Sequence, residues 1–172
     1  TPIRGGRYRN GCIVDLDEGA SRKDGIRFTS EALGEHLLLA GEIRLELAVS
    51  TSAKDADFVA RLVDVWPDGY AMPVGEGLIR LSRRGADGRL EWVEPGRAYR
   101  IRIPLGPTAL HVPKGHRLRV DIASGAFPAT EINRGTGEPE WEASGNLTAL
   151  QTVLTGGSAG SRLIVTVLPD AK

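Results

Sequence analysis

The stretch that most constrains this chain is residues 57–69, which read Asp-Phe-Val-Ala-Arg-Leu-Val-Asp-Val-Trp-Pro-Asp-Gly. Phe, Val, Leu and Trp favour a pleated backbone, and the apolar positions keep no helical period. Alternate side chains of a strand point to opposite faces, and here both faces are mostly apolar. The sequence therefore predicts a central strand buried on both faces, followed by a Pro-Asp-Gly turn that starts a hairpin. Arg61 and Asp64 interrupt this strand, and each needs a partner if it is buried.

Several other segments alternate apolar and polar residues. This period of two is typical of strands that have one buried and one solvent-exposed face. Pro104 indicates that its strand lies near a sheet edge or ends there, and Ser30 can cap one helical turn over residues 30–33. Strands separated by turns, with no sustained helix, predict an all-β fold, a two-layer β-sandwich of the jelly-roll type. The predicted strands cover residues 24–29, 37–50, 57–83 (a hairpin), 90–93 (a short edge segment), 99–105, 117–124, 147–155 and 162–168. The predicted core consists of Phe58, Leu62, Leu45, Leu47, Ile101, Ile103, Val120, Ile122 and Val165.

A long polar loop, residues 125–145, separates two of these strands. A loop of this length in a compact domain is usually functional or covers another part of the molecule. Its apolar points are Phe127, Ile132 and Trp141, which makes it a candidate contact surface.

Composition excludes several classes of partner. The 172 residues suit one domain, and 22 Lys and Arg balance 22 Asp and Glu, so no net charge attracts nucleic acid or a membrane surface. The sequence shows no signal-like N-terminus and no apolar run long enough to span a bilayer. We therefore expect a soluble protein, with the cytoplasm favoured over secretion. The single cysteine, Cys12, rules out an internal disulfide.

The motifs that suggest catalysis or metal binding lack the flanking elements or the spacing that these functions need. Residues 156–160 read Gly-Gly-Ser-Ala-Gly and match the G-x-S-x-G nucleophile elbow, but strands flank them on both sides and no histidine follows Ser158. They are interpreted as a hairpin turn. His36, His111 and His116 lack the spacing of metal ligands. The sequence thus predicts no catalytic residue, no metal site and no cofactor.

Five further stretches, taken in order with residues 57–69, resemble the C-terminal domain of the CocE/NonD and X-Pro dipeptidyl-peptidase group of serine hydrolases. They are residues 41–52, 94–99 with 105–108, 114–120, 124–128 and 133–137. The family usually has three consecutive serines where this chain has Ala123-Ser124-Gly125, and an asparagine where it has Ala126. These two departures leave the fold assignment unchanged and concern only contacts of the loop.

The resemblance implies a particular domain organisation. In that family, an α/β-hydrolase domain carries the Ser-Asp-His triad, and a jelly-roll domain of galactose-binding-like fold follows it. Residues 1–172 are therefore expected to form one jelly-roll domain, in which residues 1–23 are an irregular segment leading in from an upstream hydrolase domain. The family's crossover from that domain resembles Thr-Pro-x-x-Gly-Gly at residues 1–6. By this resemblance Arg7, Tyr8 and Arg9 line the substrate cleft, although they replace apolar residues expected there.

The function implied is that of a non-catalytic module of a serine hydrolase that cleaves an ester or amide bond. Its expected partners are the upstream α/β-hydrolase domain, contacted through Phe127, Ile132 and Trp141, and a second copy of itself in a homo-oligomer; nucleic acid and membranes are not expected. For Phe127 and Trp141, folding back onto their own sandwich is the alternative. The substrate stays open between an aminoacyl ester, a β-lactam side chain, a cocaine-like ester and a proline dipeptide.

The alternative function is a carbohydrate-binding module, which a galactose-binding-like fold permits. Such a module needs a flat, exposed aromatic platform. An aromatic content of 5%, with Trp66, Trp92 and Trp141 far apart in the sequence, argues against one.

Overall fold

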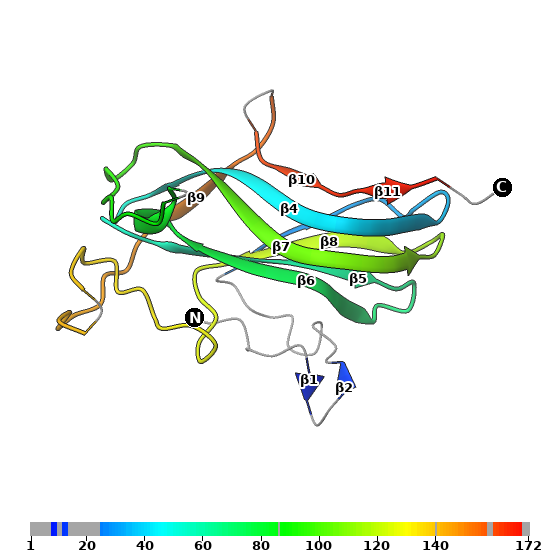
Figure 1. The fold of residues 1–172 in the computed structure, drawn as a ribbon, viewed down its shortest axis with the longest axis horizontal. Helices are drawn as coiled ribbons and strands as arrows, with labels where there is room; N and C mark the ends of the chain where they lie inside the picture. The colour runs from blue at the N-terminus through cyan, green and yellow to red at the C-terminus, as the bar shows by residue number, and fades with distance from the viewer. Residues whose placement is uncertain are drawn as a thin grey trace.

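The computed structural model describes residues 8–9, 12–13, 25–85, 87–139, 141–157 and 160–169, with side chains from residue 25 onward. Two antiparallel sheets pack face to face, so the predicted all-β sandwich is confirmed (Figure 1). The first sheet has the order β3 (Gly25–Thr29), β8 (Arg117–Ala123), β5 (Asp57–Val65) and β6 (Ala71–Arg80). In the second, β4 (Leu37–Thr51) pairs along one side with β7 (Tyr99–Val112) and along the other with β9 (Gln151–Leu154), β10 (Arg162–Ile164) and β11 (Val167–Leu168).

Two small elements lie outside these sheets. β1 (Tyr8–Arg9) and β2 (Cys12–Ile13) form a short antiparallel pair within the predicted lead-in segment. A short 3-10 helix, η1 (Leu81–Arg83), follows β6. The edge segment predicted at residues 90–93 is wrong, because these residues form no strand. In the described part of the chain, no helix is long and apolar enough to cross a membrane.

The central strand β5 is buried along its length between β6 and β8, as predicted. Its two charged interruptions both have partners. Arg61, only 4% exposed, forms an ion pair with Glu76 on the neighbouring strand β6. Asp64 Oδ1 lies 2.8 Å from Nδ1 of His116, at the far end of β5 from Asp57. The sequence-based expectation that buried charges require partners is met at both positions.

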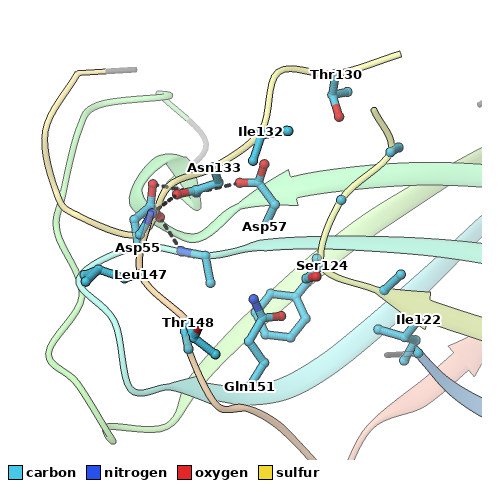
Figure 2. Close-up of a pocket in the computed structure, with 18 of the residues that line it drawn as sticks. Asp55, Asp57, Ile122, Ser124, Thr130, Ile132, Asn133, Leu147, Thr148 and Gln151 are labelled. Atoms are coloured by element: carbon cyan, nitrogen blue, oxygen red, sulfur yellow. Dashed lines mark hydrogen bonds between the residues drawn. The ribbon is translucent and has the colours of Figure 1, made fainter. Parts of the chain in front are cut away.

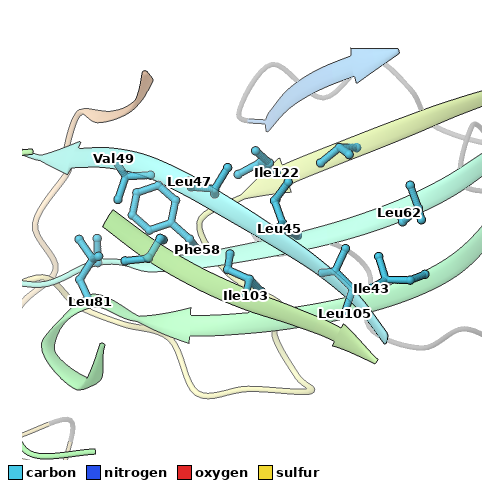
Figure 3. Packing of buried hydrophobic residues seen from close by; sticks show 14 of the residues in the cluster. Ile43, Leu45, Leu47, Val49, Phe58, Leu62, Leu81, Ile103, Leu105 and Ile122 are labelled. Atoms are coloured by element: carbon cyan, nitrogen blue, oxygen red, sulfur yellow. The ribbon is translucent and has the colours of Figure 1, made fainter. Parts of the chain in front are cut away.

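The hydrophobic core fills the space between the sheets (Figure 3). β5 contributes Phe58 and Leu62, which face residues from β4 and β7 across the interior. Every predicted core residue is buried except Val165, which is partly buried and packs against the cluster. The period-two pattern therefore identified the inward faces of β4, β7 and β8.

Pro104 lies on an edge strand, as predicted, because β7 pairs only with β4 among the described strands. The strand does not end at Pro104 but continues to Val112. The two sheets meet closely along this edge, where a Cβ added to Gly77 of β6 would lie 2.0 Å from the backbone oxygen of Pro104. Only glycine allows this approach of the two backbones.

The helical turn predicted over residues 30–33 is wrong. The Ser30 amide donates to the Leu118 carbonyl at 2.9 Å, and the Leu33 amide donates to the His116 carbonyl at 2.8 Å. Ser30 Oγ accepts from the Leu118 amide instead of capping a helix. Backbone pairing with β8 therefore outcompetes the local helical propensity of this short segment.

Candidate functional site

The long segment between β8 and β9, residues 124–150, lies across one end of the sandwich and is called the end loop (Figure 1, yellow to orange). Its described residues, which are all but residue 140, have no regular secondary structure. The loop is longer than the predicted 125–145, because the following strand begins only at Gln151. A segment this long needs specific side-chain contacts to hold one conformation.

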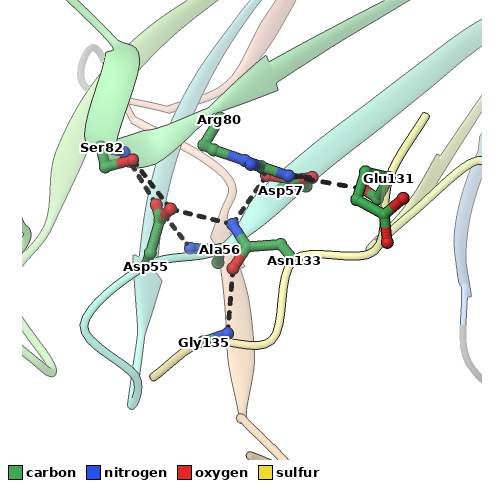
Figure 4. A network of polar contacts seen from close by, with 8 residues as sticks. All are labelled: Asp55, Ala56, Asp57, Arg80, Ser82, Glu131, Asn133 and Gly135. Carbon is green, nitrogen blue, oxygen red and sulfur yellow. Dashed lines mark hydrogen bonds and ion pairs between the residues drawn. The ribbon is translucent and has the colours of Figure 1, made fainter. Parts of the chain in front are cut away.

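Asn133 connects the end loop to the sandwich (Figure 4). Asn133 Nδ2 donates to Asp55 Oδ2 at 3.0 Å and to Asp57 Oδ1 at 2.8 Å. Its side-chain oxygen accepts from the Gly135 amide at 2.9 Å. Both aspartates lie at the start of β5 and are nearly inaccessible, at 4% and 1% exposed. Asn133 thereby uses both of its side-chain N–H donors to bridge two buried carboxylates.

Asp57 also binds Arg80 of β6 through two charge-assisted hydrogen bonds. Arg80 Nε lies 2.8 Å from Oδ1, and Nη2 lies 2.9 Å from Oδ2. These bonds raise the pKa of Arg80 above its ordinary value, against the opposing effect of burial. The same guanidinium donates to the Glu131 carbonyl of the end loop at 3.4 Å. Arg80 is therefore a second connection between the first sheet and the loop.

Asp55 accepts hydrogen bonds at every position its carboxylate offers. Oδ1 accepts from the Ser82 and Ala56 amides at 2.8 and 2.9 Å. Oδ2 accepts from Ser82 Oγ at 2.8 Å and from Asn133. A carboxylate has about four lone-pair sites, so Asp55 is saturated by neutral donors. This satisfies the buried charge but leaves no open position for another ligand.

A cavity of about 670 Å³ opens beneath the end loop (Figure 2). Its size lies within the range of small-molecule sites, roughly 300–1,000 Å³. One wall comes from the ends of β5, β8 and β9, and the other comes from the loop. Polar and apolar residues both line it, and the Asp55–Asp57–Asn133 bridge closes one side. The network thus fixes the loop in the position that creates the cavity.

The structure brings together two of the three contact residues predicted in the loop. Phe127 and Ile132 both line the cavity and are each 47% exposed. Trp141 is not among the lining residues and is 82% exposed, with Nε1 donating to Glu142 Oε1 at 3.2 Å. Trp141 therefore does not fold back onto its own sandwich, and Phe127 does so only in part.

The remaining predictions about sites fall partly outside the described residues. Arg7 and Ser158 lie outside them, and for Tyr8 and Arg9 only the backbone of β1 is described. Among the described residues, no group of three or more His, Cys, Asp and Glu side chains could hold a metal ion.

Sequence reasoning missed the anchoring network. Asp57 and Asn133 both belong to the stretches that carry the family resemblance, but neither was singled out. The available signal was an Asp-x-Asp pair at the start of a buried strand, together with an isolated asparagine in a loop. Buried carboxylates need donors, so such a pair predicts a nearby amide or cation.

Comparison with known proteins places this architecture in a family. The family model described as the X-Pro dipeptidyl-peptidase C-terminal non-catalytic domain matches residues 14–164. The chain belongs to this family. Cocaine esterase from Rhodococcus sp. (strain MB1 Bresler) is 34% identical over 116 residues, which are 67% of this chain and 20% of that protein. The resemblance to C-terminal domains of CocE/NonD hydrolases is therefore confirmed.

Solved structures agree with this family assignment. An aminopeptidase from a marine sediment Thaumarchaeota archaeon has a TM-score of 0.88 at 26% identity, over 98% of this chain and 31% of that one. An α-amino acid ester hydrolase has a TM-score of 0.85 at 26% identity, over 90% of this chain and 27% of that one. The chain thus spans about a fifth to a third of the relatives that it matches.

Proposed function

We propose that this family member is the non-catalytic C-terminal module of a serine hydrolase that cleaves an ester or an amide bond. The match to the non-catalytic domain family over residues 14–164 carries the proposal. The small share of each relative that the chain covers supports a separate catalytic region in the whole protein. The names of the relatives supply the bond type, since an esterase, an aminopeptidase and an ester hydrolase cleave esters or amides.

The end loop is the proposed contact surface for an upstream α/β-hydrolase domain. Three observations support it: the exposed side chains of Phe127, Ile132 and Trp141, their position at one end of the sandwich, and the anchoring at Asn133. Exposed apolar groups on a soluble domain mark contact sites, and aromatic anchors carry much of the energy of an interface. A loop already fixed by hydrogen bonds loses little entropy on docking.

A further part of the proposal is that the module walls the substrate cleft. Arg7, Tyr8 and Arg9 remain the residues proposed nearest the substrate, on the family resemblance alone. A homo-oligomer is a further proposed arrangement, and it rests on the same resemblance.

If the end loop contacts the hydrolase domain, its backbone amides should exchange hydrogen more slowly when that domain is present. Residues 127–141 should exchange at least about tenfold more slowly in a longer protein carrying that domain than in the 172-residue chain, because docking excludes water. The turn at residues 66–70, at the other end of β5, is the internal control and should exchange equally in both. Equal exchange of residues 127–141 in both proteins would rule out the end loop as the contact surface.

The 172-residue chain alone should lack esterase activity. We expect no hydrolysis of p-nitrophenyl acetate above the buffer rate, and no change on Ser158→Ala, because no histidine follows Ser158 to act as its base. The measurement is absorbance of released p-nitrophenol, with fluorophosphonate labelling as a second readout. Labelling of Ser158, or a real rate lost in Ser158→Ala, contradicts the non-catalytic assignment.

Two of the three tryptophans considered for the carbohydrate-binding alternative, Trp66 and Trp141, lie at opposite ends of the sandwich. Trp66 directly follows β5 at the end opposite the end loop, where it packs edge-on against Tyr70 with ring centroids 5.3 Å apart. Trp141 belongs to the end loop. The two indoles therefore do not combine into one flat platform.

A further inference from the structure

We propose that the cavity beneath the end loop binds a small uncharged molecule with an apolar body and a hydroxyl or amide group. The cavity shares Phe127 and Ile132 with the proposed contact surface for the hydrolase domain, so its ligand binding is tested on the 172-residue chain, where that domain is absent. The volume of the cavity, the residues that line it and the charges around it each restrict which ligand can bind.

The apolar part of the cavity fits a compact hydrophobic group. Phe58, Ile122 and Val153 line the wall formed by the strands, and Phe127 and Ile132 line the wall formed by the loop. A volume of about 670 Å³ holds a ring or a short aliphatic chain together with a polar substituent. Burial of such a group removes apolar surface from water, which favours binding.

The polar part of the cavity offers one buried hydroxyl without a partner and three more accessible polar side chains. Ser124, Thr130, Thr148 and Gln151 line it, and within the described part of the chain none of these side chains has a hydrogen-bond partner (Figure 2). Thr130 is the most informative, because its Oγ1 is fully buried without one. A buried hydroxyl without a partner costs free energy, and a ligand that pairs with it recovers this cost. Hydroxyl and amide groups serve as both donor and acceptor, so they match these side chains.

The charges around the cavity disfavour ionised ligands. The described lining residues include Asp55 and Asp57 but no Lys, Arg or His, so a carboxylate or phosphate finds no cation there. An ammonium group finds no open carboxylate either, because Asp55 is saturated and Asp57 is paired with Arg80. Burying an unpaired ion is costly, so the site selects neutral molecules.

Three probes with the same ring and different head groups test this selectivity on the 172-residue chain. They are benzamide, benzoate and benzylammonium, titrated into the labelled protein and followed by amide NMR shifts. We expect benzamide to shift amides of residues 122–133 and 146–153 saturably. The two ions should bind at least about tenfold more weakly, which is the typical cost of one unsatisfied polar group. Binding of benzoate or benzylammonium as tightly as benzamide, or no saturable shifts with benzamide, overturns the proposal.

Substitution of Thr130 gives opposite effects on stability and on binding. Thr130→Val removes the unpaired hydroxyl at nearly constant volume, so the Tm should rise by about 2–4 °C. The same change should raise the Kd for benzamide about 3–10-fold. Thr108→Val, on β7 away from the cavity, is the matched control and should leave the Kd unchanged. If Thr130→Val does not fold, Thr148→Val replaces it with the same expected loss of affinity. An unchanged Kd in the folded variant overturns the assignment.

Discussion

Replacing Asp57 with alanine is expected to lower the free energy of unfolding by about 3 kcal/mol, as measured by urea denaturation. The substitution removes both hydrogen bonds to the Arg80 guanidinium and one of the two carboxylates that hold Asn133. Breaking a buried ion pair by removing one partner costs about 3–5 kcal/mol. The lower end of that range applies because the Arg80 side chain is 20% exposed and regains water.

Two comparisons separate this effect from a general loss of charge. Asp87→Ala breaks an exposed pair with Arg89, 3.2 Å apart, and should change stability by less than about 1 kcal/mol. The double variant Asp57→Ala/Arg80→Met should cost less than the sum of the single changes, because it leaves no unpaired buried cation. If Asp57→Ala costs no more than Asp87→Ala, the network does not hold the fold as described.

Leu62→Ala is expected to cost about 2–5 kcal/mol, the range for creating a cavity in a packed core. Leu62 is fully buried near the centre of β5 and packs in the core cluster with side chains from both sheets. Chemical denaturation with a fixed two-state slope measures the loss. The matched control is Leu150→Ala, since that leucine is 74% exposed and should contribute less than about 0.5 kcal/mol. Equal losses in the two variants contradict the core as described.

The fold was largely predictable because its long strands each show one simple pattern. Phe58 and Leu62 on one face and Val59 on the other mark β5 as a strand apolar on both faces. Alternation of apolar and polar residues marks β4 and β7, whose outer faces contact solvent. Pro104 also indicated an edge strand, because proline lacks the backbone N–H that a central strand would donate. The all-β sandwich is confirmed, whereas the galactose-binding-like subclass remains a prediction.

The site was less predictable because it joins residues far apart in the sequence. Asp55 and Asn133 are 78 positions apart, and the conformation of a long loop leaves no period that reveals which of its side chains turns inward. The error at Ser30 has a related origin, since a distant strand supplied partners that the local sequence could not indicate. Sequence patterns therefore located the sheets, whereas the contacts between the end loop and the sheets required the structure.

The bridge made by Asn133 also bears on the chemical ageing of the protein. Deamidation converts asparagine to aspartate, which would replace two N–H donors by a third carboxylate beside Asp55 and Asp57. Like charges at hydrogen-bond distance repel strongly, so that single change would break this bridge between the end loop and the sandwich. Deamidation begins when the following backbone nitrogen attacks the side-chain carbonyl carbon, and this requires the amide to rotate. Two carboxylates and the Gly135 amide hold the Asn133 amide in place. The hydrogen bonds by which Asn133 bridges the loop and the sandwich therefore also slow its deamidation.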